Sequence, residues 1–257
     1  MMGAHLQQNG AALGAMASPL GVRQAVQAYA RAAGVLYLLI IVIGLLDEAL
    51  VRGTLVVAGD AAATYARIVA AESTWRLGIA AELVLLVCAL ALTWIWYLLL
   101  RPVNKNLMLL AVFFALTSLA IEAVSALSLE AVLTPLAHSM QGIDAPQRQA
   151  MAYGGVIAHA HSFGLALIFF GVECLIVGYL LRRSTYFPNA IGWMMQIAGT
   201  CYLVNSFCMV LSPALAGMLF PAILLPCLVG EGAFCLWLLI KGVDLAAWDK
   251  AGASLVA

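Results

Sequence analysis

Histidine and carboxylate side chains occur in this sequence within stretches that are otherwise apolar. His159 and His161 are separated by a single alanine in GGVIAHAHSFG, and no Lys, Arg, Asp or Glu stands between Arg148 and Glu173. Histidine together with carboxylates is a ligand type for divalent metals such as Zn²⁺ or Fe²⁺, and is equally a set of general acids and bases. We therefore expect acid–base or metal chemistry, with His161, Glu82 and Glu122 as catalytic residues or metal ligands and with Glu48, Glu130, His159, Asn205 and Glu231 lining the polar site.

Motifs with an established mechanism do not accompany these residues. The sequence contains no HExxH, ExxH, GxSxG, GxGxxG or phosphate-loop pattern. Two histidines at i and i+2 also lack the spacing with which a helix chelates an ion. The residue types therefore predict a class of chemistry without identifying a substrate or a metal.

The composition places this chemistry in a membrane. Of 257 residues, 65% are hydrophobic and only 9% are charged, which is not typical of a water-soluble domain. Twelve Lys and Arg residues balance twelve Asp and Glu residues, so no basic surface is available to attract nucleic acid. We expect an integral membrane protein whose partners are the lipid bilayer and a hydrophobic small molecule.

Six stretches are long and apolar enough to cross the bilayer as helices, which takes about 20 residues each. All six cysteines fall inside these stretches and none forms a CxxC pair, so we expect buried thiols rather than disulfides or zinc ligands. The predicted fold is an all-α bundle of six transmembrane helices, with spans near Tyr29–Val51, Trp75–Leu100, Leu107–Leu136, Ala152–Leu181, Ala190–Leu211 and Ala214–Ile240.

The distribution of Lys and Arg predicts the orientation of these spans. Eight of these residues flank one set of span ends and four flank the other, and the richer side is normally cytoplasmic. Both termini are then cytoplasmic. We expect a flexible leader over residues 1–28, a transmembrane domain over 29–242 and a short cytoplasmic tail over 243–257, in a bacterial cytoplasmic membrane.

The longest connection follows the first span and reads RGTLVVAGDAAATYARIVAAESTW. Asp60 can cap a helix there, and Tyr65, Ile68 and Val69 recur at the spacing of one apolar face. We expect a short amphipathic helix on the outer surface. It serves either as a plain connector that covers the bundle or as a lid.

Depth in the membrane brings several polar residues to one level. Glu82, His159 and His161 stand near the outer starts of spans two and four, roughly 10 to 14 Å below the boundary at about 1.5 Å per residue. Charged groups at such depths normally face the interior of the bundle and matter to function. Glycines at 164, 171 and 178 form a seam in span four, and His161 lies on the side of that seam. We therefore expect His161 to face the interior, and His159 to lie about 200° around the helix from it.

Several segments of the sequence, in this order, carry a family resemblance: RAAGVLYLLIIVIGLLDE, GDAAATYARIVAAESTWRLGI, LRPVNKNLMLLAVFF, FFGVECLIVGYLLRRSTYFPNAIG and LLPCLVGEGAFCLWLLIKGV. With them the chain resembles a family of bacterial six-span membrane proteins called domain of unknown function 4386. The resemblance implies the topology and no activity. The resemblance implies that His161, Glu82 and Glu231 are the residues usual in this family. It also implies three departures: Asn205 and His159 each stand where the family often has an acid, and Glu173 stands where it often has a histidine.

Three functions fit these observations. The first is an intramembrane enzyme that acts on a lipid-soluble substrate through Glu82, Glu122 and His161, with or without a divalent metal. The second is a small proton- or ion-coupled transporter, favoured by Pro221 and Pro226, which are expected to loosen span six. The third is a structural or stress-related protein whose polar residues only hydrogen-bond between helices.

Overall fold

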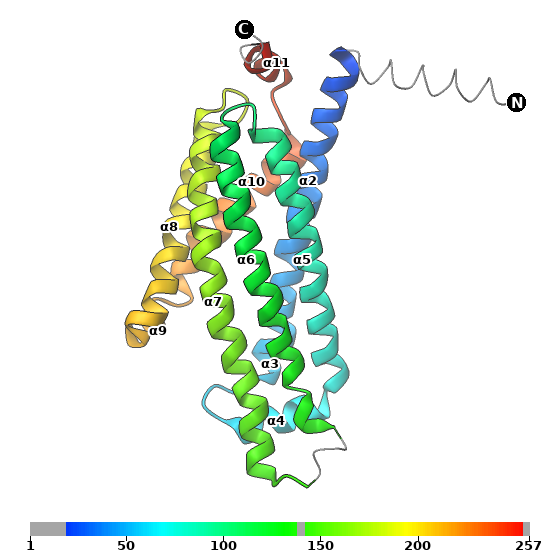
Figure 1. Ribbon diagram of the computed structural model, residues 1–257, viewed down its shortest axis with the longest axis vertical. Helices are drawn as coiled ribbons and strands as arrows, with labels where there is room; N and C mark the ends of the chain where they lie inside the picture. The colour runs from blue at the N-terminus through cyan, green and yellow to red at the C-terminus, as the bar shows by residue number, and fades with distance from the viewer. Residues whose placement is uncertain (1–18, 138–141, 254–257) are drawn as a thin grey trace, which may run out of the picture.

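The computed structural model describes residues 19–137 and 142–253, and within them the chain is all-helical with no strand. Six helices are long and apolar enough to span a membrane, which confirms the predicted six-span architecture. Figure 1 shows them side by side as an elongated bundle. The spanning stretches are Gly21–Leu55, Glu72–Leu100, Lys105–Leu136, Ala145–Arg183, Asn189–Leu211 and Ala222–Ile240.

The bundle is a closed ring. The main helices are α2 (Pro19–Asp47), α5 (Glu72–Leu100), α6 (Lys105–Ala131), α7 (Ala145–Arg183), α8 (Asn189–Leu211) and α10 (Leu225–Ile240). Each packs against the next one in the chain, and α10 packs against both α8 and α2. The first and last spans are therefore neighbours, as the blue and orange ribbons show in Figure 1.

One end of the bundle is covered by the short helix α4 (Ala61–Ala70), and we call it the α4 end. Asp60 caps α4 as predicted, because its carboxylate accepts a hydrogen bond of 2.8 Å from the backbone N–H of Ala63. Ile68 of α4 is buried with Trp75 of α5 in a small apolar cluster. Helix α4 is thus fixed to the bundle by an apolar face.

The opposite end, the α11 end, holds the main apolar core and the C-terminal helix α11 (Leu245–Ala253). Tyr186 is buried in the α7–α8 connection, where its hydroxyl group donates a 2.7 Å hydrogen bond to the carbonyl oxygen of Leu99. Trp248 of α11 packs edge-on against the Tyr186 ring, with centroids 4.9 Å apart. The sequence predicts only a tail here, whereas the chain folds back over the bundle.

The ends of the first span differ from the prediction. Helix α2 begins at Pro19, so residues 19–28 are helical rather than part of a leader, and residues 1–18 lie outside the described residues. At its other end α2 passes into a π-helical turn, η1 (Glu48–Arg52), before the short helix α3 (Gly53–Leu55). Hydrogen bonds from i to i+5 place residues five apart above one another in such a turn.

Span six is interrupted earlier than predicted. Helix α9 (Pro213–Leu219) ends before Phe220, and the 3₁₀ turn η4 (Ala222–Leu224) leads into α10. Pro226 stands in the first turn of α10, where a missing N–H removes no intrahelical bond. The expectation of a loosened helix beside Glu231 is therefore wrong, because α10 runs unbroken through that residue.

Candidate functional site

A network of charged side chains surrounds Arg52 near the α4 end. The guanidinium group contacts three carboxylates: Nη2 lies 2.8 Å from Asp47 Oδ2, and Nε lies 2.9 Å from Glu48 Oε2. Its Nη1 lies 3.1 Å from Glu82 Oε2 on α5. We call Asp47, Glu48, Arg52, Glu82, Ser125 and His159 the Arg52 cluster.

His159 of α7 completes the cluster. Its Nε2 lies 3.2 Å from Arg52 Nη1, and its Nδ1 lies 2.8 Å from Ser125 Oγ on α6. A guanidinium group can only donate, so Nε2 is the acceptor and the ring hydrogen is on Nδ1. Ser125 Oγ in turn donates to the carbonyl oxygen of His159 over 3.0 Å. These contacts assign a neutral His159 in one tautomer and join four helical segments.

The local backbone explains how these side chains meet. Asp47 and Arg52 are five residues apart, and the π-helical turn between them aligns the two side chains on one face. On α5, a Cβ atom at Gly78 would lie 2.6 Å from Asp47 Oδ1, a separation too short for any side chain. Gly78 therefore makes room for the Asp47 carboxylate one turn before Glu82.

The buried part of the cluster contains more negative than positive charge. The Asp47 and Glu82 side chains are 4% and 5% exposed, Arg52 is 22% exposed, and Glu48 is 63% exposed at the edge. Two buried carboxylates thus face one guanidinium, which leaves a formal charge of −1 before Glu48 is counted. Asp47 Oδ1 and Glu82 Oε1 are buried without a hydrogen-bond partner. Glu82 Oε1 is also 3.9 Å from His159 Nδ1.

Glu122 lies beside this cluster. It is half-buried on α6, three residues before Ser125, and interacts electrostatically with both Glu82 and Arg52. Glu122 is therefore a fourth carboxyl group in the electrostatic neighbourhood of Arg52. Its predicted role together with Glu82 stays a prediction.

The expectation that His161 faces the interior is wrong. His161 is exposed on α7, and the buried histidine is His159. The glycine seam packs against α8, where a Cβ at Gly164 would meet Met209.

The remaining predicted lining residues are spread over the bundle. Glu130 is exposed near the end of α6. Asn205 is buried on α8, where its amide nitrogen lies 3.9 Å from the sulfur of Met209. Glu231 is buried on α10 and accepts a hydrogen bond from the Tyr202 hydroxyl group. Of the five residues, only Glu48 and His159 belong to the Arg52 cluster.

The predicted metal ligands do not form a common site. Within the described residues, no group of three or more His, Cys, Asp or Glu side chains is arranged to hold a metal ion. In the Arg52 cluster the guanidinium group occupies the space between the carboxylates. His161 is exposed on α7 whereas Glu82 is buried in the Arg52 cluster, so among the described residues the predicted set is not gathered at one metal site.

Sequence reasoning missed Arg52, which it counts only as a loop charge. The available signal was the acidic pair Asp47–Glu48 followed by Arg52, because four or five residues separate the opposite charges. A signal for Ser125 was also available, because Ser118, Glu122 and Ser125 stand at the spacing of one helix face. Both serines are buried and hydrogen-bonded to α7.

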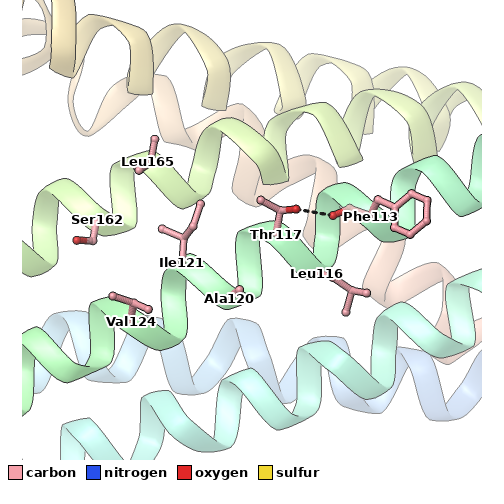
Figure 2. Close-up of a pocket in the computed structure, with 8 residues that line it drawn as sticks. All are labelled: Phe113, Leu116, Thr117, Ala120, Ile121, Val124, Ser162 and Leu165. Atoms are coloured by element: carbon pink, nitrogen blue, oxygen red, sulfur yellow. Dashed lines mark hydrogen bonds between the residues drawn. The ribbon is translucent and has the colours of Figure 1, made fainter.

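A shallow apolar groove runs between α6 and α7 and has a volume of about 680 Å³. Figure 2 shows that its walls come from these two helices and that the Thr117 hydroxyl group bonds back to the carbonyl oxygen of Phe113. Ile121, the neighbour of Glu122, contributes to the lining. The other lining residues are Leu116, Ala120, Val124, Ser162 and Leu165.

Comparison with known proteins identifies a family and a distant relative. The family model described as Domain of unknown function (DUF4386) matches residues 32–242. An uncharacterised protein of Archaeoglobus fulgidus is 26% identical over 150 residues, which cover 58% of this chain and 74% of the relative. No solved structure matches the chain.

Proposed function

We propose a function for this chain as a member of the DUF4386 family, to which it belongs because the family model matches most of its length. The proposed function is that of a small proton-coupled transporter in a bacterial cytoplasmic membrane. The termini lie in the cytoplasm and the Arg52 cluster lies in the outer half of the bilayer. The observation that carries the proposal is the excess of buried carboxylates over buried cations in that cluster.

An uncompensated carboxylate is expensive in a medium of low dielectric constant, and a proton is the simplest compensation. The unpartnered oxygen atoms Asp47 Oδ1 and Glu82 Oε1 are places where such a proton can reside. A proton added to Glu82 weakens its ion pair with Arg52 and leaves the guanidinium group to Asp47 and Glu48. When Glu82 gains or loses a proton, the contacts that hold α2 to α5 therefore change.

His159 supports the same function. Its neutral ring carries a hydrogen on Nδ1 and accepts from Arg52 on Nε2, so it senses the position of the guanidinium group. Since His159 belongs to α7, movement of Arg52 is transmitted across the helical bundle from the first span to the fourth. A bistable contact of this kind is what coupling between a proton and a transported solute requires.

The second candidate is an intramembrane enzyme for a lipid-soluble substrate. It is favoured by the apolar groove, because Ile121 in the groove wall is adjacent to Glu122 in the sequence. An acyl or isoprenoid chain would occupy the groove, and the Glu122 carboxyl group on the same helix would have to turn toward it to act as the general acid or base.

Proton flux in proteoliposomes tests the transporter. We expect vesicles that contain the protein to dissipate an imposed pH gradient faster than empty vesicles, and Glu82→Gln to remove the difference. Glu72→Gln is the matched control, because Glu72 stands on the same helix in an exposed pair with Arg76. Flux equal to that of empty vesicles, or flux unchanged by Glu82→Gln and Asp47→Asn, would contradict the proposal.

The enzyme is tested by lipid mass spectrometry. Purified protein is incubated with a bacterial lipid extract, and a lipid species that forms with the wild type but not with Glu122→Gln supports catalysis. If Glu82→Gln and Glu122→Gln both lower the thermal stability, and the wild type shows neither proton flux nor lipid conversion, a structural role is favoured instead.

A further inference from the structure

A second polar site lies within the bundle, toward the α11 end. Glu231 of α10 is 8% exposed, and its carboxylate accepts a hydrogen bond from Tyr202 of α8. Glu173 of α7 is 3% exposed and interacts electrostatically with Glu231. In the described part of the chain, neither carboxyl group forms an ion pair with Lys, Arg or His.

An unpartnered hydroxyl group belongs to this site. Tyr37 of α2 is only 2% exposed and its Oη has no hydrogen-bond partner. The same hydroxyl group is close enough to Glu231 to interact with its carboxylate. A buried polar atom without a partner is rare in folded proteins, so this hydroxyl group, which lies beside the Glu231 carboxylate, is available to donate a hydrogen bond to it.

Tight packing surrounds the site. A Cβ atom at Gly230 would lie 2.8 Å from the carbonyl oxygen of Met194, so α10 and α8 are in backbone contact beside Glu231. The Trp96 and Phe234 rings pack on Tyr37 at centroid distances of 5.5 and 6.2 Å. The other titratable groups that face the site are the thiols of Cys174 and Cys227, which are neutral in their usual form.

The site is separate from the Arg52 cluster. Glu173 and His159 both belong to α7 and are 14 residues apart. At about 1.5 Å per residue, the helix places them roughly 21 Å apart along its axis. Arg52, which contacts His159, is therefore too far along the bundle to balance Glu173 and Glu231.

We propose that Glu231 and Glu173 form a second proton-binding site, completed by the hydroxyl groups of Tyr202 and Tyr37. The pair takes up a proton from solvent, so that the site carries at most one negative charge inside the membrane. Tyr202 donates to the remaining carboxylate, and Tyr37 supplies a further donor. This inference does not rest on the transporter proposal, although two proton-binding sites at different depths along α7 would be consistent with a proton-coupled transporter.

A hydrophobic carbodiimide tests the site in the detergent-purified full chain. The reagent takes the proton of a buried carboxylic acid onto nitrogen, accepts the carboxylate oxygen on carbon, and rearranges to a stable N-acylurea that mass spectrometry locates. We expect labelling of the peptide that contains Glu231 or Glu173 near neutral pH, and its loss in Glu231→Gln or Glu173→Gln. Glu72→Gln, on the surface, should leave labelling unchanged. Absence of label at both sites overturns the proposal.

Infrared spectroscopy provides a second reading that needs no reagent. A protonated carboxyl group has a carbonyl-stretch band distinct from that of a carboxylate, and we expect the wild type to show one near neutral pH that Glu173→Gln or Glu231→Gln removes. If one variant fails to fold, the wild-type band and the other variant decide. A spectrum without such a band contradicts the inference. Protection from labelling by Na⁺ or K⁺ at constant pH would identify a metal-cation site instead. Neither measurement uses an ion gradient, so failed transport leaves both results intact.

Discussion

Arg52 and His159 are joined by a hydrogen bond of 3.2 Å between Nη1 and Nε2, although 107 residues separate them in the chain. The bond connects the π-helical turn near the end of the first span to the fourth span. Because arginine cannot accept a hydrogen bond, it also determines which ring nitrogen of His159 carries the hydrogen. The geometry of the whole cluster therefore depends on one guanidinium group.

Removal of that guanidinium group should destabilise the protein strongly. Arg52→Met leaves Asp47 and Glu82 as unpaired buried carboxylates, and breaking a buried pair in this way costs about 3–5 kcal/mol. We expect a lower midpoint of thermal unfolding in detergent, followed by circular dichroism. The triple variant Arg52→Met, Asp47→Asn, Glu82→Gln removes the unpaired charges and should recover most of the loss. If the triple variant is as unstable as the single one, charge pairing is not the cause.

The two histidines offer a matched comparison. His159→Ala removes a buried ring that is bonded to Ser125 and Arg52, and leaves their polar groups without partners, so a loss of about 1–3 kcal/mol is expected. His161→Ala changes an exposed side chain and should alter the free energy of unfolding by less than about 0.5 kcal/mol. Chemical denaturation of both variants measures the difference. Equal destabilisation by the two would contradict the assignment of His159 to the interior.

Gly78 is expected to resist enlargement. In Gly78→Ala the new methyl group would lie 2.6 Å from Asp47 Oδ1 and 3.0 Å from Val51, so the carboxylate must move away from α5. Gly154→Ala is the control, since a Cβ there meets nothing within 4 Å. Both changes gain about 1 kcal/mol of helix propensity, so the difference in melting temperature reports the clash. A Gly78→Ala protein as stable as Gly154→Ala would show that the cluster tolerates the displacement.

Tyr186 gives the protein a sensitivity to alkaline pH. Burial raises the pKa of the Tyr186 phenol above its ordinary value, so the folded state keeps the proton while the unfolded chain releases it near pH 10. The resulting stability is complete below about pH 10 and falls as the pH rises above it, because the unfolded state then binds fewer protons. Melting temperatures from pH 8 to 12 should fall more steeply for the wild type than for Tyr186→Phe. Tyr179→Phe, which changes an exposed tyrosine, should follow the wild type.

The sequence predicted the six spans well, because the bilayer imposes length and apolarity on each segment independently of its neighbours. The Asp60 cap was equally predictable, since capping depends on residues within one turn. Helical periodicity separated the two histidines onto different faces of α7 but did not identify the buried one. A π-helical turn changes the face on which Arg52 lies, and which histidine of α7 is buried depends on the helices that pack against it.

The closed ring of helices has a consequence for biogenesis. All members of the Arg52 cluster belong to the first four spans, whereas the Glu231 site needs α10 to arrive between α8 and α2. Since chains are synthesised from the N-terminus, the two sites mature at different times. A nascent chain that ends after α7 already contains every partner of Arg52. Tyr37 lacks its neighbours Glu231 and Phe234 until α10 has been synthesised.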